Sequence, residues 1–142
     1  MVCYAINCTR AKFTIMLMTV VFWRTSPVGM LALVIMCGGD GVADIVGRRC
    51  GSWKLPWNEQ KSWAGSAAML LCGFFLSLVY LWFFCFLGYF SCPIPSHPLL
   101  RVFLISLGAT VVESLPINGY IDDNISVPVT AVLLSKLLLA SA

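Results

Sequence analysis

Two aspartates lie four residues apart at the end of an apolar run. If residues 28–46 form a helix, Asp40 and Asp44 share one face, where two like charges repel each other. A divalent cation relieves that repulsion, and Mg²⁺ is typically held by one or two carboxylates together with substrate phosphates. We therefore expect Asp40 and Asp44 to bind Mg²⁺. The alternative is that they pair with Arg48 and Arg49 at a membrane surface.

Glycines and basic residues follow the acids in a pattern that suits phosphate. Gly39 and Gly41 flank Asp40, and glycine lets the backbone come close to a ligand, although it also packs membrane helices. The stretch KSWAGS at 61–66 resembles a helix N-terminus with a serine cap, which is a ready site for anions. The plainer interpretation of the basic residues is that they set membrane topology. The predicted phosphate-binding residues are Gly39, Gly41, Arg48, Arg49, Lys54, Lys61, Ser62, Gly65 and Ser66.

A second polar segment begins at Glu113. Pro116 and Gly119 interrupt the chain there, and Asp122 and Asp123 then lead into another apolar run. Favourable interaction with a helix dipole explains one acid at a helix N-terminus, but it explains three acids between apolar helices poorly. We expect Glu113, Asp122 and Asp123 to form a second metal site or to supply the catalytic base.

The composition indicates that lipid surrounds the elements carrying these residues. Hydrophobic residues make up 60% of the 142 residues and charged residues 11%, and the mean hydropathy is +0.92. Soluble domains carry about 25% charged residues. We expect an all-α fold, a polytopic membrane helix bundle with four to five transmembrane helices. Residues 1–142 form one domain, in which 38–66 and 113–128 are polar catalytic loops.

Apolar runs give the expected helices. The clearest is residues 67–90, which carry no charge and are long enough to cross a bilayer. The other expected helices are 13–23, 28–46, 99–115 and 125–142. Because two helices separate Lys61 from Glu113, the two polar segments should lie on one face of the membrane. The seven cysteines are odd in number and contain no CxxC pair, so we expect small apolar helix residues and no zinc site.

Several segments together resemble the plant phytol and farnesol kinases of the polyprenol kinase family. They are CGGDGVADIVGRR at 37–49, KLP at 54–56, KSWAGS at 61–66, VESLP at 112–116 and DDNISVP at 122–128. The similarity extends from about residue 20 to about residue 139. Members of this family have further membrane helices before this region, so the resemblance implies an N-terminally truncated form.

The resemblance implies phosphorylation of an isoprenoid alcohol, phytol or farnesol or geranylgeraniol, by CTP with a divalent metal in a plastid membrane. The products feed tocopherol synthesis or isoprenoid recycling. The expected partners are membrane lipid, the alcohol and the nucleotide, and no nucleic acid is expected. The chain contains no GxxxxGK[ST] sequence, so a P-loop enzyme is excluded.

Two other functions remain open at this point. DGVAD at 40–44 is similar to the DGxxAR opening of CDP-alcohol phosphotransferases, and CDP-diacylglycerol synthases share a polytopic architecture. A CDP-lipid cytidylyl- or phosphatidyltransferase is therefore one alternative. The other is a non-catalytic membrane protein or a transporter that uses the acids as an ion pathway.

Overall fold

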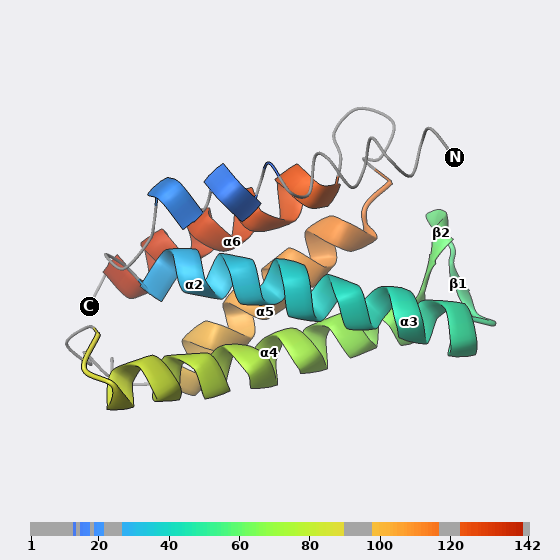
Figure 1. Cartoon of the computed structure of the whole chain (residues 1–142). Coiled ribbons are helices and arrows are strands. Elements are labelled where there is room, and N and C mark those ends of the chain that lie inside the picture. The colour runs from blue at the N-terminus through green and yellow to red at the C-terminus, as the bar shows by residue number, and fades with distance from the viewer. Residues whose placement is uncertain are drawn as a thin grey trace.

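The fold is an antiparallel bundle of helices with a small hairpin at one end (Figure 1). It is described here from a computed structural model, which covers residues 13, 15–17, 19–21, 27–89, 98–116 and 123–140. The described residues between 13 and 21 are helical. They precede the bundle. The helices and strands that position the polar residues all begin after residue 26.

The first long helix is continuous from residue 27 to residue 50 and has three parts. They are α2 (Pro27–Val34), the π-helical η1 (Ile35–Gly39) and α3 (Asp40–Cys50). The backbone N–H of Asp40 donates to the carbonyl of Ile35, which is the i to i+5 bond of a π-helix. Single π turns within α-helices often occur at functional sites, and this one ends directly before Asp40.

Three further helices and a hairpin complete the bundle. They are α4 (Trp63–Phe86), α5 (Pro98–Ser114) and α6 (Asp123–Ala140), and the antiparallel hairpin of β1 (Lys54–Leu55) and β2 (Asn58–Ser62) joins α3 to α4. The apolar runs of the sequence therefore predicted every one of these helices. The run at 67–90 ends early, because Gly88 adopts a positive φ of 71° and the helix stops at Phe86.

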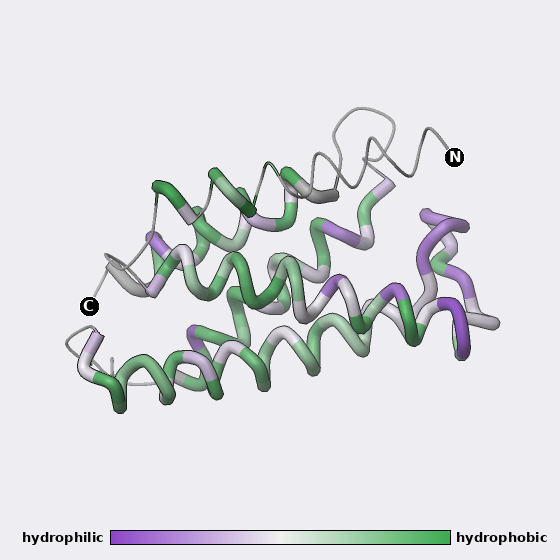
Figure 2. Tube along the Cα trace, in the orientation of Figure 1, coloured by the Kyte–Doolittle hydropathy of each residue, from purple (hydrophilic) through white to green (hydrophobic). Residues whose placement is uncertain are grey.

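Two of the described helices are long and apolar enough to cross a membrane, residues Pro27–Cys50 and Trp63–Phe86, and Ile125–Leu138 is a shorter apolar helix. The expected all-α architecture is confirmed, whereas the expected number of four to five spans is not. Figure 2 shows that α4 is apolar along most of its length and that polar residues gather at the hairpin and the end of α3.

The expected polar loops are shorter than predicted. Residues 38–50 are helical, because the glycines at 38–39 fit a π turn and the apolar residues after Asp40 continue the helix. Only residues 51–62 connect α3 to α4, and they include the hairpin. Glu113 and Ser114 end α5, while residues 123–128 begin α6, so both ends of the second polar segment are helical.

Close packing between α3 and α4 depends on small residues. Gly39, Ala43 and Gly47 recur every fourth residue, and α4 presents Gly65 and Gly73 to them. A Cβ added at Gly65 would lie 3.1 Å from the Ala43 carbonyl oxygen, and one at Gly39 would lie 3.3 Å from Met69 Cγ and 3.7 Å from Gly73 Cα. Small residues at this spacing let membrane helices approach closely.

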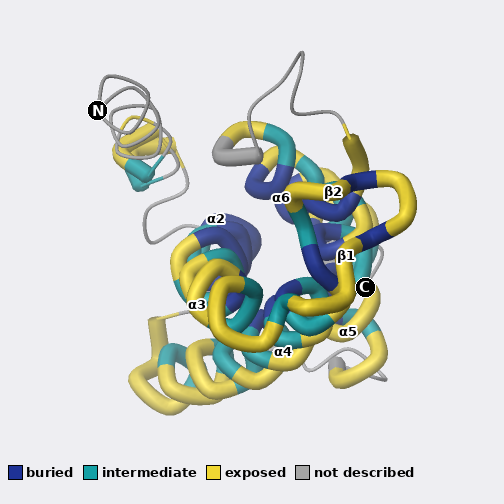
Figure 3. Tube along the Cα trace, turned by 90° about the vertical axis from the view of Figure 1, so that its right-hand side faces the viewer, coloured by how far each residue is buried: buried dark blue, intermediate teal, exposed yellow. Residues whose placement is uncertain are grey.

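The core lies between the helices, and the outer face of α4 stays exposed (Figure 3). Leu31, Ile35, Met69 and Ile105 are almost fully buried. The exposed apolar side chains of α4 include Leu71, Phe75, Val79, Trp82 and Phe86, as expected of a helix that faces lipid. Cys37, Cys50 and Cys72 are free, but Cys85 forms a disulfide, so the expectation of plain helix cysteines is wrong for Cys85.

Candidate functional site

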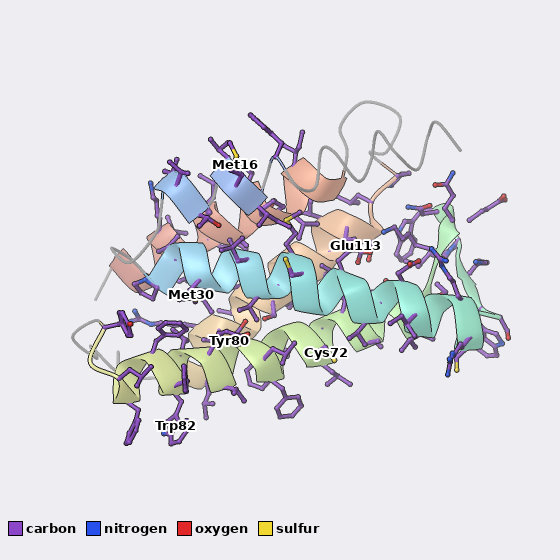
Figure 4. The ribbon with its side chains drawn as sticks, viewed as in Figure 1. Met16, Met30, Cys72, Tyr80, Trp82 and Glu113 are labelled. Atoms are coloured by element: carbon purple, nitrogen blue, oxygen red, sulfur yellow. The ribbon has the colours of Figure 1, made fainter. Side chains whose placement is uncertain are left out.

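The two polar segments of the sequence meet at an ion pair. Lys61 Nζ, at the end of β2, donates to Glu113 Oε1 in the last turn of α5 at 2.5 Å. The Glu113 side chain is only 2% exposed, and that of Lys61 is 24% exposed. A buried carboxylate needs such a partner, since an unpaired charge is costly away from water. Figure 4 shows Glu113 beside the hairpin, so Lys61 and Glu113 lie at one end of the bundle, as predicted.

The hairpin also binds the backbone at the end of α5. Trp57 Nε1 donates to the Ser114 carbonyl oxygen at 3.1 Å, and Asn58 Nδ2 lies 3.5 Å from the carbonyl oxygens of Ser114 and Leu115. The last carbonyls of a helix have no partner within it, so these side chains act as an external cap. The sequence did not identify Trp57, Asn58 or Ser114 as site residues. The one available signal was Pro56, a turn residue inside the basic segment.

The start of α4 matches the predicted serine-capped N-terminus. Ser62 Oγ accepts a hydrogen bond from the Gly65 N–H at 3.2 Å. The Trp63 N–H donates to the Trp53 carbonyl oxygen at 3.1 Å. These two backbone donors therefore already have acceptors within the protein. Phosphate binding by Ser62 and Gly65 stays a prediction, and it would require these bonds to be exchanged.

A ladder of hydroxyl groups connects α4 to α5 beside the ion pair. The Ser114 hydroxyl donates to the Thr110 carbonyl oxygen at 2.8 Å. The Thr110 hydroxyl donates to the Ser106 carbonyl oxygen, also at 2.8 Å. The hydroxyls of Ser66 and Ser114 lie 3.2 Å apart. Since Ser114 already donates to Thr110, Ser66 is the donor between them. Ser66 is thus tied to α5 and is half-buried.

The two predicted ligand glycines differ in what surrounds them. Gly39 lies against Met69 and Gly73 of α4, so helix packing alone accounts for a glycine there. A Cβ added at Gly41 would meet nothing within 4 Å, and the residue is exposed. Packing therefore does not explain Gly41. Phosphate binding by Gly41 stays a prediction, and an exposed glycine would allow a ligand to approach the backbone closely.

The aspartates of α3 lie one turn apart, as predicted, and Asp44 has a protein partner. Arg48 Nε donates to Asp44 Oδ1 at 2.8 Å and Arg48 Nη2 lies 2.7 Å from Oδ2, with both side chains more than half exposed. This is the surface pairing that the sequence left open as an alternative. An exposed pair of this kind contributes little to stability, so it can exchange for another ligand.

A metal at these aspartates would need ligands from elsewhere. In the part of the chain that the structure describes, no three His, Cys, Asp or Glu side chains group as a metal site. Two carboxylates fit Mg²⁺ that arrives with a nucleotide, because the phosphates supply further oxygens. They do not fit a metal held by protein alone. The donor set of Asp40 and Asp44 is thus suited to a metal–nucleotide complex.

The remaining predicted residues fall at the same end of the bundle or outside the description. Arg49 and Lys54 are exposed, at the end of α3 and in β1. Asp123 begins α6 and is described by its backbone, whereas Asp122 lies outside the described residues. Glu113 is the acid of the second segment that the structure brings to a base of the first segment.

Comparisons with known proteins give one consistent result. No protein-family model matches the chain, and no solved structure matches it. The chain is 52% identical over 118 residues to phytol kinase 1, chloroplastic, of Arabidopsis thaliana. It is 50% identical over 124 residues to a probable phytol kinase, chloroplastic, of Triticum aestivum, and 53% identical over 118 residues to probable phytol kinase 1, chloroplastic, of Oryza sativa subsp. japonica.

These alignments cover most of this chain and a smaller part of each relative. They include 83%, 87% and 83% of this chain but 38%, 41% and 37% of the three relatives. The chain therefore spans about two fifths of the length of the curated relatives it matches. The matched segment carries the α3 aspartates, the hairpin and the ion pair at the end of α5. Over most of its own length, the chain is a homologue of the plant phytol kinases.

Proposed function

We propose that this chain is the phosphoryl-transfer segment of an isoprenoid alcohol kinase in a plastid membrane. The acceptor would be phytol, with farnesol and geranylgeraniol as other candidates, and the donor would be CTP with Mg²⁺. Phytyl phosphate would then feed tocopherol synthesis. The names of the relatives support a phytol kinase in the chloroplast. The choice of CTP rests on the family resemblance.

The observation that carries the proposal is the contact between Lys61 and Glu113. It joins a basic, glycine-rich segment to an acidic one at one end of an apolar bundle. Phosphoryl transfer needs positive charge around the phosphates and an acceptor for the alcohol proton, and most of its catalysis is positioning and electrostatics. An apolar bundle suits an acceptor that dissolves in lipid.

The residues would divide the work as follows. Arg49, Lys54 and Lys61 would hold the phosphates, and Asp40 and Asp44 would hold the metal. When bound, Mg²⁺ neutralises charge on the phosphate chain. The alcohol oxygen would bond to the terminal phosphorus as the bond from that phosphorus to the bridging oxygen breaks. An acid of the second segment, Glu113, Asp122 or Asp123, would accept the alcohol proton.

A labelling assay tests this function and its closest alternative. Membranes carrying the chain, or a version as long as its relatives, receive CTP, ATP, GTP or UTP labelled in the terminal phosphate, together with phytol, farnesol or geranylgeraniol. We expect labelled lipid phosphate from CTP and phytol, and none from an Asp40→Asn control. CTP labelled in the cytidine, supplied with phosphatidic acid in place of the alcohol, would reveal a CDP-lipid, which forms as pyrophosphate leaves. Formation of CDP-lipid without lipid phosphate from the long version would make the chain a cytidylyltransferase.

A further inference from the structure

A tryptophan lies near each end of α4. The two tryptophans indicate how deep in a membrane the residues packed against α4 would lie. Trp63 and Trp82 are 51% and 69% exposed, and Figure 4 shows Trp82 pointing away from the bundle at the end far from Glu113. Nineteen positions separate them, so they lie about 28 Å apart along a helix that rises 1.5 Å per residue. The hydrocarbon core of a bilayer is about 30 Å thick, and tryptophan prefers its two boundaries.

The contacts between α3 and α4 then place the aspartates below one boundary. Gly47 lies against Gly65, near the Trp63 level, whereas Gly39 lies against Met69 and Gly73, which are six and ten positions beyond Trp63. Asp40 follows Gly39 directly. Its backbone therefore lies roughly 9–15 Å beyond the Trp63 level, inside the interval between the two tryptophans, and Asp44 is about one turn closer to the boundary.

Charged residues occupy part of the exposed side of this helix, beside the apolar Ile45, which is 57% exposed. Gly41 and Asp44 are exposed, and Arg48, which is 64% exposed, pairs with Asp44. Carboxylates at such a depth ordinarily face water or protein, because moving a charge into hydrocarbon is expensive. At the same depth on α4, Leu71 is 57% exposed and is an ordinary lipid-facing residue. At this depth, α3 therefore exposes charged side chains, whereas α4 exposes an apolar one.

We infer that the exposed face of α3, from Arg48 through Asp44 to Gly41, lines a water-filled inlet that reaches from the headgroups to mid-membrane depth. This inference rests on the proposed membrane location and extends the proposed function. The inlet would admit the phosphate chain of a metal-bound nucleotide. At Gly41 the phosphates could approach the helix backbone, since nothing lies within 4 Å of the position of a Cβ there.

Cysteine labelling at matched depth tests the inlet. All seven cysteines are first replaced by alanine to give a background without thiols, and Gly41→Cys or Leu71→Cys is then introduced. A charged methanethiosulfonate reagent is applied to the protein in phosphatidylcholine vesicles, together with a neutral maleimide that reaches both sites. Thiols react as thiolates, which form in water, so we expect the Gly41→Cys variant to react with the charged reagent about tenfold or more faster than the Leu71→Cys variant.

A second measurement separates failure of the inlet from failure of the membrane location. Variants retaining only Trp63 or only Trp82 are placed in vesicles with bromine near the headgroup or near the chain end. Stronger quenching by the shallow bromine at both tryptophans, with fast labelling at position 41, supports the inlet. The same quenching with equal labelling at positions 41 and 71 would overturn the inlet alone. Absence of quenching by either lipid would overturn both the inlet and the membrane location.

Discussion

Lys61 Nζ lies 2.5 Å from Glu113 Oε1, although the two residues are 52 positions apart in the sequence. Two helices run between them, so the contact forms only when α4 and α5 pack antiparallel. It places a cation beside the last turn of α5, where the helix dipole also favours positive charge. The pair therefore supports the fold at the point where the proposed chemistry is located.

Removing one partner of this pair should destabilise the protein strongly. Lys61→Met leaves Glu113 buried without its cation, and loss of one member of a buried pair costs about 3–5 kcal/mol. The double variant Lys61→Met with Glu113→Leu should recover much of that loss, because no charge remains buried. Thermal unfolding in detergent micelles measures both. A double variant destabilised by the sum of the Lys61→Met and Glu113→Leu single variants would show that the pair is not coupled.

Asn58→Ala should loosen the end of α5. Asn58 is 7% exposed and its amide reaches two terminal carbonyls of that helix, so its loss leaves them uncapped at a cost of about 1 kcal/mol. Hydrogen exchange should accelerate in the last turn of α5 and remain unchanged in the middle of α4. Glu59→Ala, an exposed neighbour in the same strand, serves as the control and should change neither region.

The glycines of the site should respond to alanine in opposite ways. At Gly65 a Cβ would lie 3.1 Å from the Ala43 carbonyl oxygen, so Gly65→Ala should push α3 from α4 and lower stability by about 1–3 kcal/mol. At Gly41 nothing is within 4 Å, so Gly41→Ala should leave stability unchanged or raise it by up to about 1 kcal/mol. Its kinase activity should nevertheless fall.

Unfolding measurements and initial rates, taken on the same samples, separate these two effects. Full activity in the Gly41→Ala variant would remove the case for a ligand at that glycine. A stable Gly65→Ala protein would instead indicate that α3 and α4 can shift without losing their contact.

Asp44 should matter for nucleotide use and hardly for folding. Its pair with Arg48 is exposed and screened by water, so Asp44→Asn should change stability by less than about 0.5 kcal/mol. The same variant should lose activity with Mg²⁺ and CTP, as should Asp40→Asn. Arg48→Gln also breaks the pair but keeps the carboxylate, so it should retain more activity than Asp44→Asn. Because Arg48 is itself a predicted phosphate ligand, equal rates for these two variants would show that the arginine or its pair matters as much as the carboxylate, which would remove the separate case for a metal at Asp44.

The sequence predicted the helices well because long apolar runs are a direct signal. The run at 99–115 corresponds to α5 (Pro98–Ser114), and the run at 125–142 to α6 (Asp123–Ala140). It did not predict the hairpin, because β1 has two residues and β2 is largely polar, so neither strand has a clear alternation of apolar residues. The strands form because Leu55 is buried and Asn58 binds α5, and both contacts depend on the tertiary fold.

Within the candidate site, residue types were easier to predict than partners. The spacing of Asp40 and Asp44 predicted that they share one face of a helix, and KSWAGS at 61–66 predicted the serine-capped start of α4. Neither spacing nor composition could show that Lys61 pairs with Glu113, since that contact depends on how two helices pack. Gly39 and Gly41 are equivalent in the sequence, and only the neighbouring helix distinguishes them.

The π turn at residues 35–39 has a consequence for every residue that follows it in the helix. A π turn accommodates one residue more than an α turn, and one residue corresponds to a rotation of about 100°. α2 packs against both α6 and α4, whereas α3 packs mainly against α4, so the contact with α6 is lost across this turn. Deleting one residue here would rotate the acids and the packing glycines together, away from their present directions. A single extra residue in the π turn therefore sets the direction in which Asp40 and Asp44 lie around the helix axis.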